Sequence, residues 1–203
     1  ATAFGAGGFV GVYLEALARG DVSDALSLPG VDTHGVNRLL LQDGTLAGLS
    51  DIHQISDEER GGAHWVTVGW TTPHGSSITT FVVRRIGTRL GLFPQWGFAV
   101  SPLATVSLSV RNDARFTLNG VQEVTPVHSS EAVDYAVLVP GSYTFGHRTA
   151  LLTAEPRSVI ADTVGQNLSA IVQPEANARF IAGVTAEVHR QLDACAKQTV
   201  LFP

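Results

Sequence analysis

The stretch FVGVYLEALARGDVSDALSL, residues 9–28, decides how this chain starts to fold. Its first half carries apolar residues at helical spacing on one face, namely Phe9, Val12, Tyr13, Ala16 and Leu17. Gly20 stands where a helix C-cap is favoured, and Asp21 can cap the helix that follows. The stretch therefore predicts two successive helices whose apolar face must be covered by later parts of the chain.

Four strand-like runs come next, with turn residues between them. The runs are DIHQI (51–55), HWVTVGWTT (64–72), SITTFVVRR (77–85) and RLGLF (89–93), and the turns are TPHGS (72–76) and IGT (86–88). Helices followed by an antiparallel meander favour a curved sheet wrapped over the N-terminal helix, because both apolar faces are then buried. We expect this α+β unit to span residues 1–103.

Short alternating runs continue through residues 104–173 and predict a small all-β sandwich. The runs are TVSLSV (105–110), RFTLNG (115–120), DYAVLVPGSYTFGHR (134–148), RSVIADTV (157–164) and NLSAIVQP (167–174). Turn residues at Asn119-Gly120, Pro140-Gly141 and Gly165 separate them at the spacing typical of such modules. We expect no helix longer than about two turns between 105 and 173.

The last segment, residues 174–203, predicts a C-terminal helix followed by an extended tail. Pro174 and Glu175 suit the start of a helix, and the apolar face would be Phe180, Ile181, Val184, Val188 and Leu192. The helix could pack back on the β-sandwich, or it could be the start of a further domain. Both alternatives stay open.

Composition and charge exclude several classes of protein. Apolar residues make up 44% of the 203 residues and charged residues 15%, which indicates a folded chain. The net charge is -5 and Lys and Arg form no cluster, so we expect no nucleic-acid-binding surface. No apolar run reaches the roughly 18 residues of a membrane span. Because the chain has no Met, we expect it to derive from a longer protein.

Two parts of the chain resemble known families. YLEALARGDVSDALSL and the strands after it resemble the cystatin-like, nuclear-transport-factor-like cone domains of exported or membrane-anchored bacterial proteins, actinobacterial ones especially. LNG (118–120) followed by VLVPGSYTF (137–145) resembles surface-exposed bacterial β-modules, in which Val stands where this chain has Leu118. The resemblance implies an extracytoplasmic place in the cell envelope, with the anchor or signal upstream, and an envelope component or another envelope protein as partner.

The same resemblance suggests a candidate pocket. Isomerases and dehydratases of the cone fold place Tyr, Asp and His inside the open end of the cone. The matching candidates here are Tyr13, Asp51 (or Asp32 in its place), His53 and Trp70. Against this, Tyr13 lies on the apolar helix face, where a residue usually belongs to the core. The spacings Asp32-x-His34 and Asp51-x-His53 could pair an acid with an imidazole for general base work, or could be surface pairs near strand ends.

Aromatic residues crowd the stretch RLGLFPQWGFAV, residues 89–100. Phe93, Trp96 and Phe98 around a Pro-Gln turn could form an exposed patch for a partner or glycan. Alternatively, they could hold the two units together at a hinge, and we expect the hinge because the β-sandwich follows within a few residues.

Other site motifs are weak or missing. The histidines show no metal-ligand spacing, so we expect no metal, and we expect no cofactor. FGAGGFVG (4–11) departs from the dinucleotide fingerprint, since no strand precedes it and Val10 breaks the glycine spacing, which favours a flexible leader. Cys195, in a segment that reads as extended, either pairs in a disulfide with a downstream partner or is a free thiol.

These patterns together predict a non-catalytic, extracytoplasmic binding or spacer region of a bacterial cell-envelope protein. The alternative is a small-molecule enzyme or a binder of lipophilic ligands that uses the cone cavity.

Overall fold

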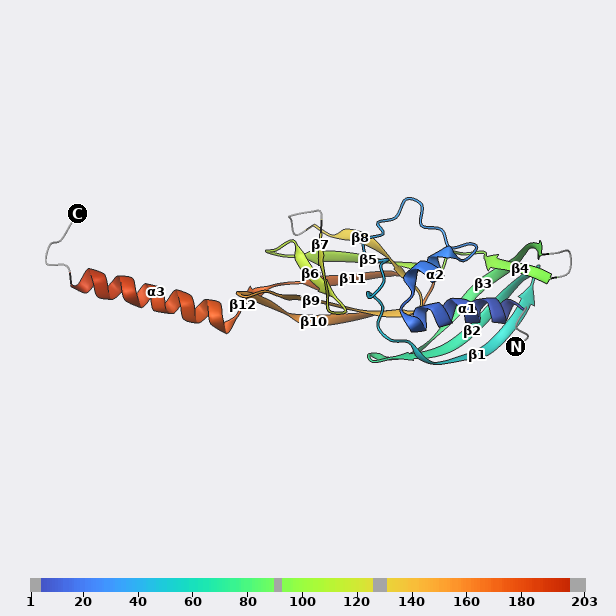
Figure 1. Cartoon of the computed structure of the whole chain (residues 1–203), viewed down its shortest axis with the longest axis horizontal. Coiled ribbons are helices and arrows are strands. Elements are labelled where there is room, and N and C mark those ends of the chain that lie inside the picture. Colours follow the sequence, from blue (N-terminus) through green and yellow to red (C-terminus); the bar gives the residue numbers. More distant parts are fainter. Residues whose placement is uncertain (1–4, 90–92, 126–130, 198–203) are drawn as a thin grey trace.

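The computed structural model describes residues 5–89, 93–125 and 131–197 (Figure 1). Within these residues the chain combines three helices with several largely antiparallel sheets, and 48% of it is strand. This agrees with the expected α+β class. An N-terminal helix-and-sheet part and a β-rich part lie end to end, and the last helix projects from the far end (Figure 1).

Helices α1 (Ala6–Arg19) and α2 (Val22–Ser27) meet at the predicted break. Gly20 adopts the left-handed conformation that a C-cap requires, with φ of 74°, and Asp21 accepts a 3.0 Å hydrogen bond from the Asp24 backbone N–H. Because α1 already begins at Ala6, the expectation of a flexible glycine-rich leader over 4–11 is wrong for its helical part. Burial of its apolar face stabilises α1 as a helix although it contains glycines.

The buried face of α1 is rotated slightly from the predicted one. Tyr13 and Leu17 are buried as expected, together with Ala16, while Phe9 is partly buried. Val12, however, is 54% exposed, so the prediction that it packs under the sheet is wrong. The face is instead completed by Ala6, Val10 and Leu14.

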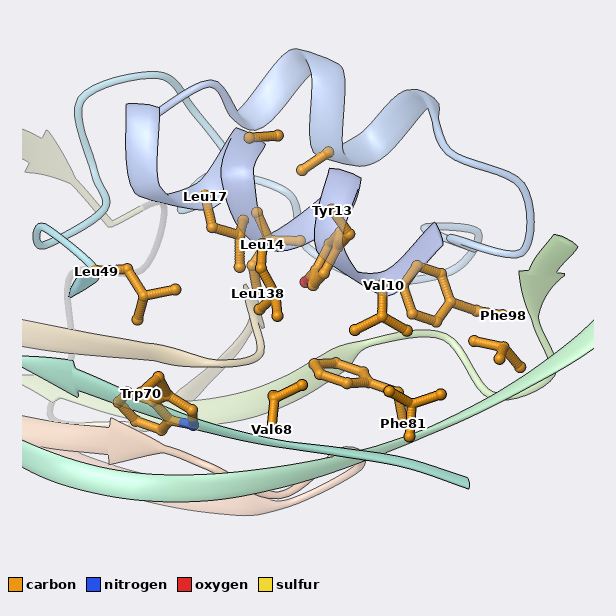
Figure 2. Packing of buried hydrophobic residues seen from close by; sticks show 14 of the residues in the cluster. Val10, Tyr13, Leu14, Leu17, Leu49, Val68, Trp70, Phe81, Phe98 and Leu138 are labelled. Carbon is orange, nitrogen blue, oxygen red and sulfur yellow. The ribbon is translucent and has the colours of Figure 1, made fainter. Parts of the chain in front are cut away.

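Four antiparallel strands form the first sheet, in the order β1-β2-β3-β4. Their bounds are β1 (Ser50–Arg60), β2 (Ala63–Thr72), β3 (Gly75–Arg89) and β4 (Phe93–Phe98). The inner face of β2 and β3 packs against α1 and is filled by aliphatic and aromatic side chains such as Val68, Trp70 and Phe81 (Figure 2).

Three details of this sheet differ from the prediction. The first strand continues through its charged end to Arg60, because its ladder with β2 runs to the Gly61-Gly62 turn. Residues 86–88 form no turn, since β3 passes through them with one bulge opposite β4. The expected Pro-Gln turn lies within β4.

The β-rich part has two sheets that enclose a second hydrophobic core. One sheet has the order β12-β10-β9-β6-β7 and the other β11-β5-β8, with β11 parallel to β5. The bounds are β5 (Leu103–Val110), β6 (Arg115–Leu118), β7 (Val121–Val124), β8 (Val133–Leu138), β9 (Gly141–Arg148), β10 (Leu152–Ala161), β11 (Asn167–Val172) and β12 (Glu175–Ala176). The described residues between 105 and 173 contain no helix, which confirms that prediction.

The two hydrophobic cores are joined, because some segments contribute side chains to a core outside their own part of the molecule. Ala136 and Leu138 of β8 lie in the core under α1. The connection between α2 and β1 contributes Leu40 to the β-rich core and Leu41 to the core under α1. The N-terminal sheet and the β-rich part therefore share a packed boundary.

Helix α3 (Ala178–Ala196) starts later than predicted, because Asn177 provides its N-cap and Glu175 belongs to β12. The Asn177 side chain accepts a hydrogen bond from the Phe180 backbone N–H at 3.0 Å and donates one to the Ala150 carbonyl at 3.0 Å. None of the residues of α3 is buried, so the alternative in which it packs back on the sandwich is wrong.

Candidate functional site

Tyr13 lies at the centre of the core under α1, and its hydroxyl reaches the boundary between the two parts of the molecule. The side chain is fully buried, and the hydroxyl donates a 2.7 Å hydrogen bond to the Val139 carbonyl. The ring makes edge contacts with Phe81 and Phe98 (Figure 2). Burial raises the pKa of Tyr13 well above 10.0, and the neighbouring Tyr143 raises it further. A neutral hydroxyl satisfied in this way is a structural group.

Trp70 is also a satisfied core residue. It is buried on the same inner face, and its indole N–H donates to Thr79 Oγ1 at 2.9 Å. Thr79 in turn donates to the Asp162 carbonyl at 2.6 Å, and Ser77 donates to an Asp162 carboxylate oxygen at 2.9 Å. The chain of hydrogen bonds runs from the first sheet into the β-rich part.

Asp51 and His53 are exposed, whereas Tyr13 and Trp70 are buried. The imidazole of His53 covers Gly69, on the face of β2 opposite to its buried neighbours Val68 and Trp70, because successive side chains of a strand point to opposite faces. Its Nδ1 bonds to the Asp51 backbone carbonyl at 2.8 Å and not to the carboxylate. The structure thus places the His53 imidazole on the face of the first sheet opposite the one where Trp70 and Tyr13 pack.

The other predicted acid–histidine pair does form, but in solvent. Asp32 Oδ1 lies 2.6 Å from His34 Nδ1, with the two side chains 67% and 98% exposed. The pKa of Asp32 is lowered mainly by the hydrogen bond from the His34 backbone N–H, and also by the imidazole. No wall encloses the pair, so it has none of the shielding that general base catalysis uses.

The aromatic stretch divides between core and surface. Phe98 is buried against Phe9, Tyr13 and Phe81, so it cannot present its ring to a partner. Trp96 is half-buried and packs edge-on against His64. The side chain of Phe93 lies outside the described residues. The Phe98 contacts belong to the core under α1, and the aromatic group is therefore no continuous exposed patch.

The described residues show neither a metal-binding cluster nor a membrane-spanning helix. No group of three or more His, Cys, Asp or Glu side chains among them could hold a metal ion. None of the described helices combines the length and apolar character that crossing a bilayer would take. Cys195 is an exposed free thiol on α3, within a helix and not in the extended segment expected.

A hollow in the β-rich part lies between β10 of one sheet and β11 of the other. It is an open groove of about 840 Å³ between β10 and β11. It is lined by Thr153, Ala154, Glu155, Arg157, Ser158, Val159, Ser169, Ala170, Ile171, Gln173, Glu175 and Ala176. Among the described residues, β10 pairs on this side with β12 at Leu152 and Thr153, and β11 pairs with β5. Within the described part of the chain, two strand edges without a further paired strand therefore border the groove, as a site for an added strand requires.

Sequence reasoning missed this groove and a second feature, a charged cluster around a buried histidine. Asp113 and Arg115 form a bidentate pair, and His147 Nδ1 donates to the Arg115 carbonyl at 2.8 Å. Hydrogen bonds from Arg115 lower the pKa of Asp113 to about 2. The sequence signal for the pair is the spacing Asp-x-Arg beside the turn before β6. The groove has no local signal, because it depends on which edges the sheets leave unpaired.

No family model, curated protein or solved structure matches this chain.

Proposed function

We propose that this chain is a non-catalytic, extracytoplasmic binding or spacer region of a bacterial cell-envelope protein, built on a cystatin-like cone. The observation that carries the proposal is the filled concave face of the first sheet. Tyr13, Trp70 and Phe81 fill this face, and the Tyr13 hydroxyl and the Trp70 indole N–H are bonded to protein groups. On the cone interpretation this is the face that an enzyme would leave open for its substrate. Among the described residues, the buried Glu and His side chains are Glu123 and His147, and neither lies in the core under α1, where acid–base catalysis would need two titratable groups in one pocket.

The packed boundary between the two parts supports the spacer role. Leu138 of β8 is buried under α1, and Asp162 receives hydrogen bonds from Ser77 and Thr79 of β3. Such contacts keep two modules in one orientation, because moving them apart would expose apolar surface and leave buried polar groups unpaired. A binding role would use the groove between β10 and β11, where an extended segment of an envelope partner can add to a free strand edge.

The test is a thermal-shift screen against lipids, cell-wall fragments and small metabolites, run on the protein and on Tyr13→Phe. We expect no lipid or metabolite to raise the melting temperature through the cone interior. Any stabilising cell-wall fragment should act equally on both proteins, after correction for their different starting stabilities. A saturable shift by a lipid or metabolite that changes with Tyr13→Phe would replace this proposal by the alternative, a cone-cavity enzyme or lipophilic-ligand binder.

The location is tested separately. Protease added to intact source cells should cleave the natural protein if it lies outside the cytoplasm. Full protection in intact cells, with cleavage after lysis, would contradict the extracytoplasmic part of the proposal.

A further inference from the structure

Helix α3 presents an apolar face to which no described part of the chain packs. Five large side chains are 39% to 60% exposed on it, namely Phe180, Ile181, Val184, Val188 and Leu192. The helix leaves the body at β12 and extends away from both sheets (Figure 1). Its starting direction is held by Asn177, whose backbone N–H donates to the Leu151 carbonyl at 2.9 Å. The exposed face is therefore displayed on a helix that is anchored at its N-terminus.

The face has the geometry of a helix-pairing seam. At about 100° per residue, the five side chains with Gln191 and Cys195 occupy an arc of about 120°. The charged residues of the helix lie outside this arc: Arg179, Glu187, Arg190 and Asp193. Glu187 and Arg190 already bond to each other at 2.9 Å, so neither needs a partner from another chain. Pairing at this face would thus bury no unpaired charge.

We propose that this face pairs α3 with the α3 of a second copy of the chain, side by side and parallel. Ile181, Val188 and Cys195 recur every seven residues as a positions, with Val184 and Gln191 at the d positions between them. In a parallel pair each of these residues meets its own counterpart across a two-fold axis, so the pattern needs no other sequence to be complementary. β-branched residues at a positions favour two-stranded parallel pairs.

The area of the face agrees with a weak, specific dimer. At about 150 to 250 Å² for an aromatic side chain, and less for an aliphatic one, the exposed fractions leave at most roughly 500 Å² on one helix. A symmetric pair would bury at most roughly 1,000 Å² from these side chains, which is where specific interfaces begin. A membrane surface fits less well as the occupant. Helices that lie on a membrane surface carry a strongly basic polar face. The polar face of α3 instead mixes Arg179 and Arg190 with Glu187 and Asp193.

The experiment is sedimentation equilibrium of the whole chain between about 5 and 500 µM, with two variants. The protein should move from its monomer mass of 21.4 kDa toward twice that mass as concentration rises. Val188→Glu should weaken dimerisation at least about tenfold, since a charge at an a position cannot be buried unpaired. Ala186→Glu, on the opposite side of the helix, should leave it unchanged. Both variants should keep the melting temperature of the body, because α3 buries no residue in either core.

The orientation has its own readout. Mild oxidation with a copper catalyst should cross-link the dimer through Cys195 in the protein and in Ala186→Glu, and not in Val188→Glu. A monomer at all concentrations, or equal weakening by both variants, would overturn the proposal. A dimer that resists cross-linking would overturn the parallel arrangement. Binding of the monomer to anionic vesicles, lost in Val188→Glu, would assign the face to a membrane surface instead.

Discussion

The hydroxyl of Tyr13 donates a 2.7 Å hydrogen bond to the backbone carbonyl of Val139, 126 positions later in the chain. A second buried tyrosine, Tyr143, donates a 2.6 Å hydrogen bond from its hydroxyl to the carbonyl of Leu138. Two buried tyrosines thus satisfy consecutive carbonyls at the end of β8, one from each side of the boundary between the two parts. The Tyr13 bond connects the N-terminal helix to the β-rich part, and the Tyr143 bond holds the neighbouring carbonyl within that part.

Replacing Tyr13 by Phe should destabilise the protein by about 1 to 3 kcal/mol, because the buried Val139 carbonyl loses its hydroxyl donor. Urea unfolding followed by tryptophan fluorescence measures the change. Val12→Ala, one position away but 54% exposed, should change the free energy of unfolding by less than about 0.5 kcal/mol. Equal effects of the two variants would contradict the role given to the hydroxyl.

Above pH 10, the free energy of unfolding should fall more steeply in the unaltered protein than in the Tyr13→Phe variant. The pKa of Tyr13 is raised by burial above its ordinary value of 10.0, so above that pH the unfolded chain releases a proton that the folded chain keeps. The stability due to the neutral hydroxyl is complete below pH 10 and is lost as the pH rises further. Tyr143 is raised in the same direction by burial and contributes a loss that both proteins share. Parallel curves of unfolding free energy against pH would contradict the prediction.

Asp113→Asn should remove part of the acid sensitivity of the fold. The pKa of Asp113 is lowered to about 2 by Arg115, so its stabilising effect is present above pH 3.8 and lost as the pH falls toward 2. We expect a loss of about 1 kcal/mol at pH 7, reduced because Arg115 is half exposed. The difference in stability between the two proteins should be smaller below pH 2 than at pH 7, as measured by thermal unfolding at both pH values.

Leu138→Ala should destabilise both parts of the molecule together by about 2 to 5 kcal/mol. Leu138 belongs to β8 but is buried in the core under α1, so the cavity would lie at their boundary. Calorimetry should show one transition in the protein and one, at lower temperature, in the variant. Leu151→Ala, at an exposed site, is the control. Two separated transitions in the unaltered protein would show that the parts unfold independently.

Gly30→Ala should cost more than Gly35→Ala, although both glycines have positive φ, of 85° and 73°. A Cβ at Gly30 would lie 2.1 Å from the Phe98 carbonyl oxygen, whereas nothing lies within 4 Å of one at Gly35. The loss of stability in Gly35→Ala should therefore reflect only the cost of the left-handed backbone, about 1 kcal/mol. Gly30→Ala adds a clash with backbone that also bonds to Pro29, and should exceed about 2 kcal/mol. Equal losses in urea unfolding would contradict this reading of the contact.

Local chemistry was enough to predict many elements. The break at Gly20 and Asp21, the turn between β2 and β3, and the alternating runs of β5 and β11 all depend on residues close together in sequence. The end of β3 could not be predicted in this way. Ile86, Gly87 and Thr88 have the composition of a turn, but their ladder with β4 holds them in the strand.

The sequence by itself determined that α1 needs a cover, that alternating strands follow, and that the last helix is amphipathic, since these properties reside in residue type and spacing. Only the tertiary structure decided which faces are covered. It places His53 on the face of the first sheet opposite Trp70 and brings Tyr13 to Val139. Among the described residues it also leaves most of one edge of β10 and one edge of β11 without a paired strand. The physical reason is that burial and pairing are properties of distant segments, since a side chain or strand edge is satisfied only by what the whole fold places beside it.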